Sequence, residues 1–340
     1  MYFSIIMPVY NVYDYIRESL ESILSQNYKD FELIIINDGS TDGSETVCEG
    51  FKEKYPDKIK IINQENKGLL LARREGLKIA SGSYILSIDS DDILMPNSLE
   101  KIKKCIDTTQ CDVLFFDAIS EFENKNSIYN YPFSNMEIFE GEKKKDIYSL
   151  IYNGTSFNNI WNKVIKMELV DKEADYHDFS SITLGEDLLQ VLPIVTNAKK
   201  IVYLDQKCYY YRKNEFSMTQ TFNPASFSSI RRVTNVLKKY IAKWGCQSEP
   251  NVFLFWSIFP VLDSIIRSKN IKLSQNSNKL KNFFIELSND EDFLQYYSQR
   301  NNLSLSKSDN LLLSSLYNKR VNFIFFLIFC YQKLNKIRKK

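Results

Sequence analysis

Short apolar runs alternate with helix-forming segments over the first part of the chain, and this alternation limits the possible folds more than any other feature. The runs at residues 2–8, 31–37, 59–63 and 84–88 are typical of β-strands, and amphipathic segments lie between them. Residues 31–37, FELIIIN, are apolar almost throughout, as expected of a parallel strand covered on both faces. The alternation predicts an α/β fold with a doubly wound, mostly parallel sheet flanked by helices.

Two residues give local signals at the start of the chain. Pro8 lacks the N–H group that a strand ladder needs, so we expect the first strand to end there. Asp14 stands just before apolar residues at helical spacing, Ile16 and Leu20, and is predicted to cap the first helix.

Three carboxylates, Asp89, Asp91 and Asp92, directly follow the predicted strand at residues 84–88. Neighbouring anions repel one another, and carboxylate oxygens suit a hard divalent cation, Mg²⁺ or Mn²⁺, whose shell substrate phosphates complete. A simple turn before the next helix would also explain Asp91 and Asp92. The third carboxylate makes a metal–diphosphate site the preferred interpretation.

The predicted sheet brings further polar residues to this site. In doubly wound sheets, ligands bind at the carboxyl ends of the strands. Here those ends carry residues 8–11, Asp38 and residues 89–92, which we expect to cluster. The loop after the first strand reads PVYN rather than G-x-G-x-x-G, and no Walker A sequence is present. The phosphates are therefore expected to be held by a metal rather than by a glycine-rich loop.

Composition excludes several other classes of protein. Six cysteines without a C-x-x-C pair and a single histidine, His177, argue against a zinc site. The net charge is +2, but seven basic residues and no acidic residue follow Asp309. The rest of the chain is therefore mildly acidic, whereas a nucleic-acid-binding protein needs a basic surface. Neither a transmembrane run nor a signal peptide is recognised, and we expect a cytoplasmic protein.

Two acidic residues, Glu186 and Asp187, precede an apolar helical segment. On spacing alone, an acidic first turn that favours the helix dipole explains them. From residue 225 the sequence becomes helical in pattern and rich in lysine and asparagine. We predict a first domain at residues 1–224, with a nucleotide-binding half at 1–105 and an acceptor half at 106–224, and a helical region at 225–340.

The ordered motifs of residues 1–221 resemble the family 2 inverting glycosyltransferases of the GT-A fold, especially bacterial capsule and cell-wall enzymes. They are SIIMPVYN, FELIIINDGSTDGS, NKGLLLARREG, SIDSDD, GED, and YYYR followed by SMT. The resemblance implies a nucleotide site of Pro8, Val9, Tyr10, Asn11 and Asp38; further substrate contacts from Arg73, Asp89, Ser90, Glu186 and Arg212; a metal ligand, Asp91; and a catalytic base, Asp187.

The resemblance implies a metal-dependent transfer from a nucleoside-diphosphate sugar, with UDP as the expected nucleotide, to a glycan or lipid-linked glycan. A carboxylate base fits the chemistry, because the acceptor hydroxyl must lose its proton. A sugar-1-phosphate nucleotidyltransferase would need a glycine-rich, basic loop after the first strand. A binding module that lost activity is the other alternative. A homo-oligomer stays open.

Residues 319–340 lie beyond the resemblance. An apolar stretch, VNFIFFLIFCY, is flanked by basic residues and is too short to span a bilayer. A helix docked on the protein and an in-plane contact with the inner face of the plasma membrane are equally compatible with this pattern.

Overall fold

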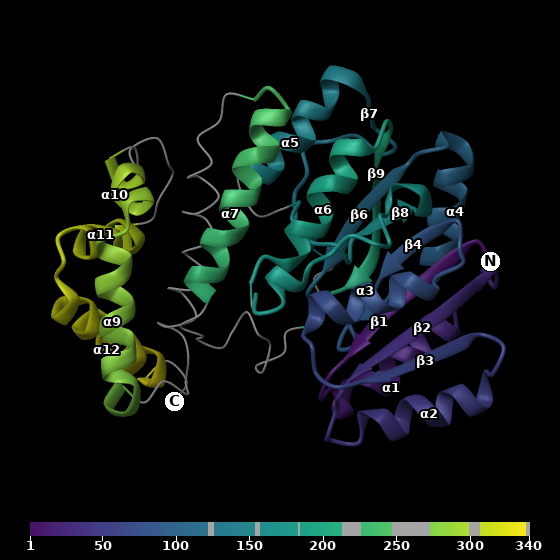
Figure 1. Ribbon diagram of the computed structural model, residues 1–340, viewed down its shortest axis with the longest axis horizontal. Coiled ribbons are helices and arrows are strands. Elements are labelled where there is room, and N and C mark those ends of the chain that lie inside the picture. Colours follow the sequence, from purple (N-terminus) through teal and green to yellow (C-terminus); the bar gives the residue numbers. More distant parts are fainter. Residues whose placement is uncertain are drawn as a thin grey trace. The chain divides into compact units, whose positions relative to one another are not determined.

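The computed structural model describes residues 1–121, 126–153, 157–182, 184–212, 226–246, 273–298 and 307–337 (Figure 1). The chain divides into two compact units. Unit 1 consists of Met1–Tyr148, Ser156–Ser181 and Glu186–Asn214, and unit 2 of Ser149–Thr155, Ile182–Gly185 and Glu215–Lys340.

Unit 1 is built on a mixed sheet with the strand order β3-β2-β1-β4-β8-β6-β9-β5, and β7 pairs with β9. The first four strands of this order are parallel, whereas β8 runs antiparallel to both β4 and β6. The strands are β1 (Phe3–Val9), β2 (Phe31–Asp38), β3 (Ile59–Gln64), β4 (Tyr84–Ser87), β5 (Ile93–Leu94), β6 (Val113–Ile119), β7 (Ile138–Phe139), β8 (Lys163–Lys166) and β9 (Ile201–Tyr210).

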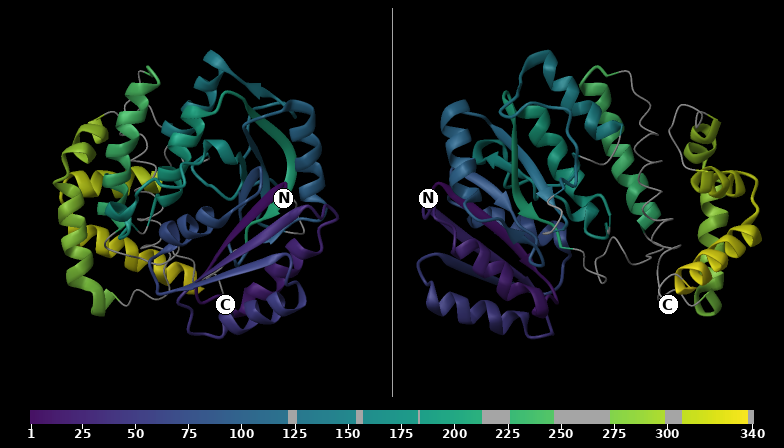
Figure 2. Two further views of the ribbon diagram at one scale, coloured as in Figure 1. Left: turned by 45° about the vertical axis from the view of Figure 1, so that its right-hand side comes forward. Right: turned by 180° about the vertical axis from the view of Figure 1, so that it is seen from behind.

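Helices cover both faces of the parallel part of this sheet, as Figure 2 shows from two sides. Alternate strand residues such as Ile5 and Leu33 pack in one core with residues of α1, α2 and α4. Their neighbours Ile6 and Ile34 pack in another core with α3. The predicted doubly wound α/β architecture is therefore confirmed. The helices of this unit are α1 (Tyr13–Leu24), α2 (Ser44–Lys54), α3 (Leu69–Ile79), α4 (Ser98–Thr109), α5 (Lys144–Tyr152, which continues into unit 2) and α6 (Glu186–Asn197).

The start of the chain differs from the sequence-based expectation in two places. Pro8 lies inside β1, which continues to Val9. This is tolerated because β4 pairs with β1 only as far as Ile6, so β1 has lost one neighbour before Pro8. Asp14 does not cap α1. Instead, Tyr13 N–H donates to Asp42 Oδ2 (2.8 Å), a carboxylate from the loop after β2.

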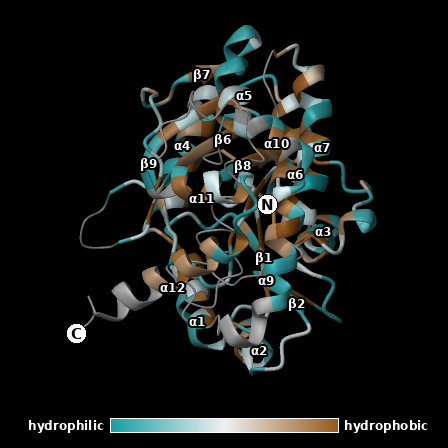
Figure 3. Cartoon of the chain, turned by 90° about the vertical axis from the view of Figure 1, so that its left-hand side faces the viewer, coloured by the Kyte–Doolittle hydropathy of each residue, from teal (hydrophilic) through white to brown (hydrophobic). Residues whose placement is uncertain are grey.

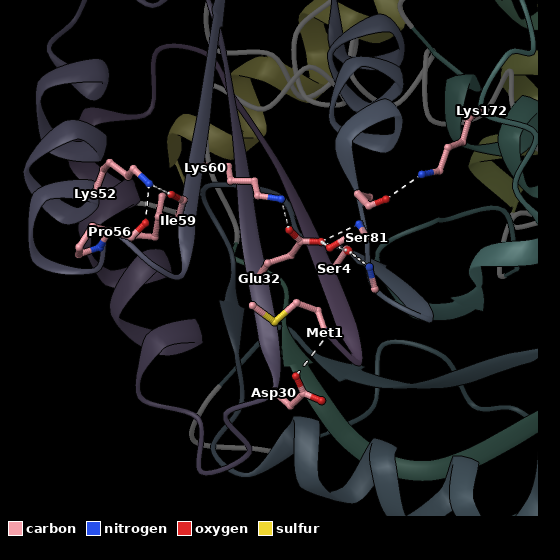
Figure 4. Close-up of polar contacts among 12 residues, drawn as sticks. Met1, Ser4, Asp30, Glu32, Lys52, Pro56, Ile59, Lys60, Ser81 and Lys172 are labelled. Atoms are coloured by element: carbon pink, nitrogen blue, oxygen red, sulfur yellow. Dashed lines mark hydrogen bonds and ion pairs between the residues drawn. The ribbon is translucent and has the colours of Figure 1, made fainter.

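Glu32, a buried carboxylate near the start of β2, connects this strand to Ser4, Lys60 and Ser81 (Figure 4). Glu32 Oε1 accepts from Ser4 Oγ (2.6 Å) and from both the N–H and the hydroxyl of Ser81 (2.7 Å each). Lys60 Nζ lies 2.7 Å from Glu32 Oε2. Burial by itself would raise the pKa of Glu32, but these hydrogen bonds lower it to about 2.

Unit 2 is helical among its described residues, in line with the predicted helical extension. Its helices are α7 (Ser226–Lys243), α9 (Leu273–Ser288), α10 (Glu291–Ser298), α11 (Lys307–Tyr317) and α12 (Val321–Ile337). Leu280, Phe284, Leu313 and Ile324 belong to one apolar core within this unit. None of the helices described here has the length and hydropathy that a membrane span requires.

Candidate functional site

The carboxyl ends of β1, β2 and β3 lie side by side, because Val9 pairs with Asn37 and Asn37 with Asn63. The loops after β1 and β2 are hydrogen-bonded to each other. Asn11 Oδ1 accepts from Thr41 N–H (2.8 Å), and Asn11 N–H donates to Ser40 Oγ (3.2 Å). Asn11 has φ +51°, a left-handed conformation that asparagine tolerates. Residues 8–11 and Asp38 are therefore brought to one edge, as predicted.

The side chain of Asp38 is buried at this edge and organises the segment that leads into α3. Asp38 Oδ1 accepts from Gln64 Nε2 (2.7 Å) and Lys67 N–H (2.9 Å), and Oδ2 accepts from Gly68 N–H (2.9 Å). Gly68 has φ +87°, a backbone conformation that L side chains rarely adopt. One oxygen, Oδ2, has a single hydrogen bond and keeps capacity for a ligand donor.

Arg73, on α3, connects two carboxylates that come from distant segments. Its Nη2 donates to Asp89 Oδ1 (2.8 Å), just after β4, and its Nη1 donates to Asp187 Oδ1, in the first turn of α6. The second oxygen of Asp187 accepts the N–H of Ile160 (3.2 Å). Arg73 is only 1% exposed, so a single buried guanidinium fixes the relative position of the two acids.

Arg73 and the acidic side chains around it shift one another's pKa values. Burial alone would lower the pKa of Arg73, but Asp187, Asp89 and Glu186 raise it, so the guanidinium stays charged. Burial, together with Asp187 and Asp91, raises the pKa of Asp89 to about 6 although Arg73 acts in the opposite direction. Burial and Asp187 raise the pKa of Glu186 to about 7. The site holds more negative than positive charge, which favours a cationic ligand.

The three carboxylates after β4 have separate roles. Asp92 is buried: its Oδ2 accepts from the Tyr209 hydroxyl (2.9 Å) and its Oδ1 from Arg212 N–H (2.8 Å). Tyr209 Oη also accepts the N–H of Asp89 (3.1 Å), so one phenol connects the segment to β9. Asp89 is engaged by Arg73. The carboxylates therefore do not converge as a three-ligand cluster.

No group of three or more His, Cys, Asp or Glu side chains in the described part of the chain is arranged to hold a metal ion. The resemblance predicts Asp91, which lies between Asp89 and Asp92 in the sequence, as the metal ligand. A single carboxylate fits Mg²⁺ or Mn²⁺ when diphosphate oxygens and water complete the shell. The residues present thus fit a metal ion that binds together with the diphosphate of the substrate, and not one coordinated by protein side chains alone.

The remaining predicted residues lie at or near this edge. Ser90 is buried and Tyr10 is exposed, and the guanidinium of Arg212 pairs with Glu18 on α1 (2.6 Å) and lies over Tyr15. The SMT sequence at residues 217–219 lies outside the described residues. His177, 81% exposed and paired with Asp175, takes no part in these contacts.

Sequence reasoning missed the residues that hold in place the segment contacting Asp187. Lys163, fully buried at the start of β8, donates to Asn159 O (2.5 Å) and Asn162 Oδ1 (2.9 Å) on the segment that carries Ile160. Burial lowers the pKa of Lys163 to about 7, although Asp187 acts in the opposite direction. Tyr209 was visible as part of YYYR, but its hydroxyl partners depend on tertiary packing.

Comparisons with known proteins bear on the family and the fold of this chain. A family model described as glycosyl transferase family 2 matches residues 4–174. Glycosyltransferase GlyA of Streptococcus pneumoniae serotype 4 is 32% identical over 231 residues, which are 64% of this chain but 32% of GlyA. Minor teichoic acid biosynthesis protein GgaB of Bacillus subtilis is 29% identical over 259 residues, which are 71% of this chain but 27% of GgaB.

Among solved structures, residues 1–349 of S. aureus TarS in complex with UDP-GlcNAc match with a TM-score of 0.59. The match covers 98% of this chain and 92% of the TarS chain at 22% sequence identity. At that identity the likeness speaks for the fold, and it confirms the predicted GT-A architecture.

Proposed function

The chain belongs to glycosyl transferase family 2, and from this premise we propose that it transfers a sugar from a nucleoside-diphosphate sugar to a hydroxyl group of a glycan acceptor, with inversion at the anomeric carbon. The role that we propose is in the synthesis of a bacterial surface polysaccharide. The family membership and the names of relatives such as GgaB support this role.

The observation that carries the proposal is the bridge that Arg73 forms between Asp89 and Asp187. Asp89 belongs to the strand edge where residues 8–11 and Asp38 would bind the nucleotide. Asp187 belongs to the segment predicted to meet the acceptor. Because one guanidinium holds both acids, it fixes the position of the proposed base, Asp187, relative to the proposed donor site. An in-line displacement requires such a fixed arrangement.

In the proposed reaction the acceptor oxygen attacks the anomeric carbon, and its proton passes to the carboxylate of Asp187. The bond from the anomeric carbon to the diphosphate oxygen breaks, and the nucleoside diphosphate leaves with the electron pair. A divalent cation held by Asp91 would neutralise the charge that develops on this leaving group. Ile160 N–H and Arg73 hold the Asp187 carboxylate in one orientation, and this carboxylate accepts the proton.

We further propose UDP as the nucleotide and residues 1–105 as the part that binds it. TarS, which shares the fold, has been solved with UDP and with UDP-GlcNAc. The loops of residues 8–11 and Asp38 offer acceptor groups for a base, including the remaining capacity of Asp38 Oδ2.

Calorimetry with UDP, GDP, CDP and their sugars, each with Mn²⁺, with Mg²⁺ and with a chelator, tests the proposal. We expect one nucleotide family to bind in a metal-dependent way, and the bound sugar to be released or transferred on incubation. Binding without any turnover of any sugar would favour the binding-module alternative. Formation of a nucleotide sugar from a nucleoside triphosphate and a sugar 1-phosphate would favour the nucleotidyltransferase.

A further inference from the structure

Helix α12 in unit 2 has two apolar faces, of which one is buried in the core of the unit and the other is partly exposed to solvent. Val321, Ile324 and Ile328 are buried in the apolar core of unit 2. On the other face Phe323, Phe326 and Phe329 are 38%, 57% and 46% exposed. The burial of Val321, Ile324 and Ile328 agrees with a helix docked on the protein. The docked helix does not explain why the other face carries exposed phenylalanines.

The three exposed phenylalanines, which we call the Phe face, form a continuous strip. They stand three residues apart, so they follow one another along one side of the helix. The rings of Phe323 and Phe326 are stacked, with centroids 6.1 Å apart and an interplanar angle of 26°. Figure 3 colours much of α12 as hydrophobic. Scattered exposed apolar residues are ordinary, but a contiguous aromatic strip marks an interaction surface.

The charges around α12 indicate what covers the Phe face. Lys319 and Arg320 precede the helix, Lys333 and Lys336 lie in its second half, and the sequence ends on Arg338, Lys339 and Lys340. No acidic residue follows Asp309. A second copy that packed through the same face would bring two positive segments together, which is unfavourable. The complementary partner is apolar in its interior and negatively charged at its surface.

We propose that the Phe face of α12 docks on an anionic lipid surface, with the helix lying in the plane of the membrane interface. Aromatic side chains then enter the boundary between headgroups and acyl chains, while the flanking lysines and arginines contact anionic headgroups. The absence of a spanning helix among the described residues agrees with an in-plane orientation. The proposal depends on α12 and the basic residues that flank it, and it does not require the proposed sugar transfer.

Flotation of the full chain with phosphatidylglycerol-containing vesicles and with pure phosphatidylcholine vesicles tests this proposal. We expect binding to the anionic vesicles that weakens as salt rises, because exposed charges are screened. The triple variant Phe323→Ser, Phe326→Ser, Phe329→Ser should bind the vesicles at least about tenfold more weakly than the parent chain, because three aromatic rings no longer enter the interface. The double variant Lys333→Gln, Lys336→Gln should reduce binding to the anionic vesicles only.

Ile285 and Leu311, on α9 and α11, are 41% and 46% exposed and provide the matched control. The variant Ile285→Ser, Leu311→Ser should bind vesicles like the parent chain. Thermal unfolding checks that each variant is folded, which we expect because the replaced side chains are exposed. The proposal is overturned if the parent chain does not float, if the triple variant floats equally, or if the triple variant changes only the oligomeric state.

Discussion

Arg73 and Asp187 lie 114 positions apart in the sequence, yet the guanidinium of one donates directly to the carboxylate of the other. The same guanidinium also holds Asp89, 2.8 Å away. Helix α3, the end of β4 and the first turn of α6 are thereby joined at one buried charge. This connection makes the function of the site sensitive to the exact shape of the group at position 73.

Replacing Arg73 by lysine should lower the rate of sugar transfer and the stability together. An ammonium group lacks the planar fork that reaches two carboxylates at once, so one acid loses its partner. Complete loss of the charge, in Arg73→Met, should cost about 3–5 kcal/mol, as for other broken buried ion pairs. Initial rates and thermal unfolding measure both effects. The neighbouring buried Arg74 contacts Asp171 O instead, so Arg74→Lys is the control and should keep its turnover.

Replacing Asp187 by asparagine should preserve binding of the sugar donor but reduce turnover by about 10²–10⁴-fold, because the amide cannot accept the proton. Steady-state rates and donor affinity separate these effects. Glu186→Gln serves as the comparison, since the pKa of Glu186 is raised to about 7 by burial and Asp187. If Glu186→Gln abolished turnover while Asp187→Asn kept it, Glu186 would be the base.

Asp91→Asn should weaken metal-dependent binding of the nucleoside diphosphate by about tenfold or more while the melting temperature stays close to that of the parent chain. Asp92→Asn should leave metal-dependent binding close to that of the parent chain but lower the melting temperature, because Asp92 accepts hydrogen bonds from Tyr209 and Arg212. Calorimetry with and without Mn²⁺ distinguishes the two variants. Unchanged metal dependence in Asp91→Asn would contradict the assignment of the ligand.

Glu32 should make unit 1 sensitive to acid. Its pKa in the folded protein is about 2, against an ordinary value of 4.5, so its contribution to stability is present above pH 4.5. That contribution, on the order of 3 kcal/mol, is lost as the pH falls from 4.5 towards 2. Urea unfolding of Glu32→Gln should show a large loss at pH 7 and a smaller one at pH 3. The exposed Glu53→Gln is the control, and equal behaviour of both variants would refute the prediction.

Lys163→Met should lower turnover about tenfold without changing donor affinity. The ammonium holds Asn159 O and Asn162 Oδ1, and the segment between them supplies the Ile160 N–H that orients Asp187. Lys166→Met, on the same strand but partly exposed, should leave turnover intact. A thermal scan shows whether the buried substitution also destabilises unit 1. Equal turnover in both variants would mean that the segment keeps its position without Lys163.

The sequence alone determined the layered α/β architecture, because apolar runs of strand length alternate with amphipathic helices and such elements can bury their surfaces in few ways. It also determined that residues 8–11, Asp38 and residues 89–92 share one edge, since parallel strands bring their carboxyl ends together. Local periodicity is enough for both conclusions.

Only the tertiary structure decided how the acids are used. The three carboxylates after β4 are indistinguishable in sequence. In the structure, Asp92 accepts hydrogen bonds from Tyr209 and Arg212, and Asp89 accepts one from Arg73. The N-terminal amide of α1 takes Asp42 rather than Asp14 as its partner, and Lys163 supports Asp187 from a strand with no motif of its own. The hydrogen-bond partner of a buried polar group is set by which segments pack against it, and segments far apart in the sequence meet only in the folded chain.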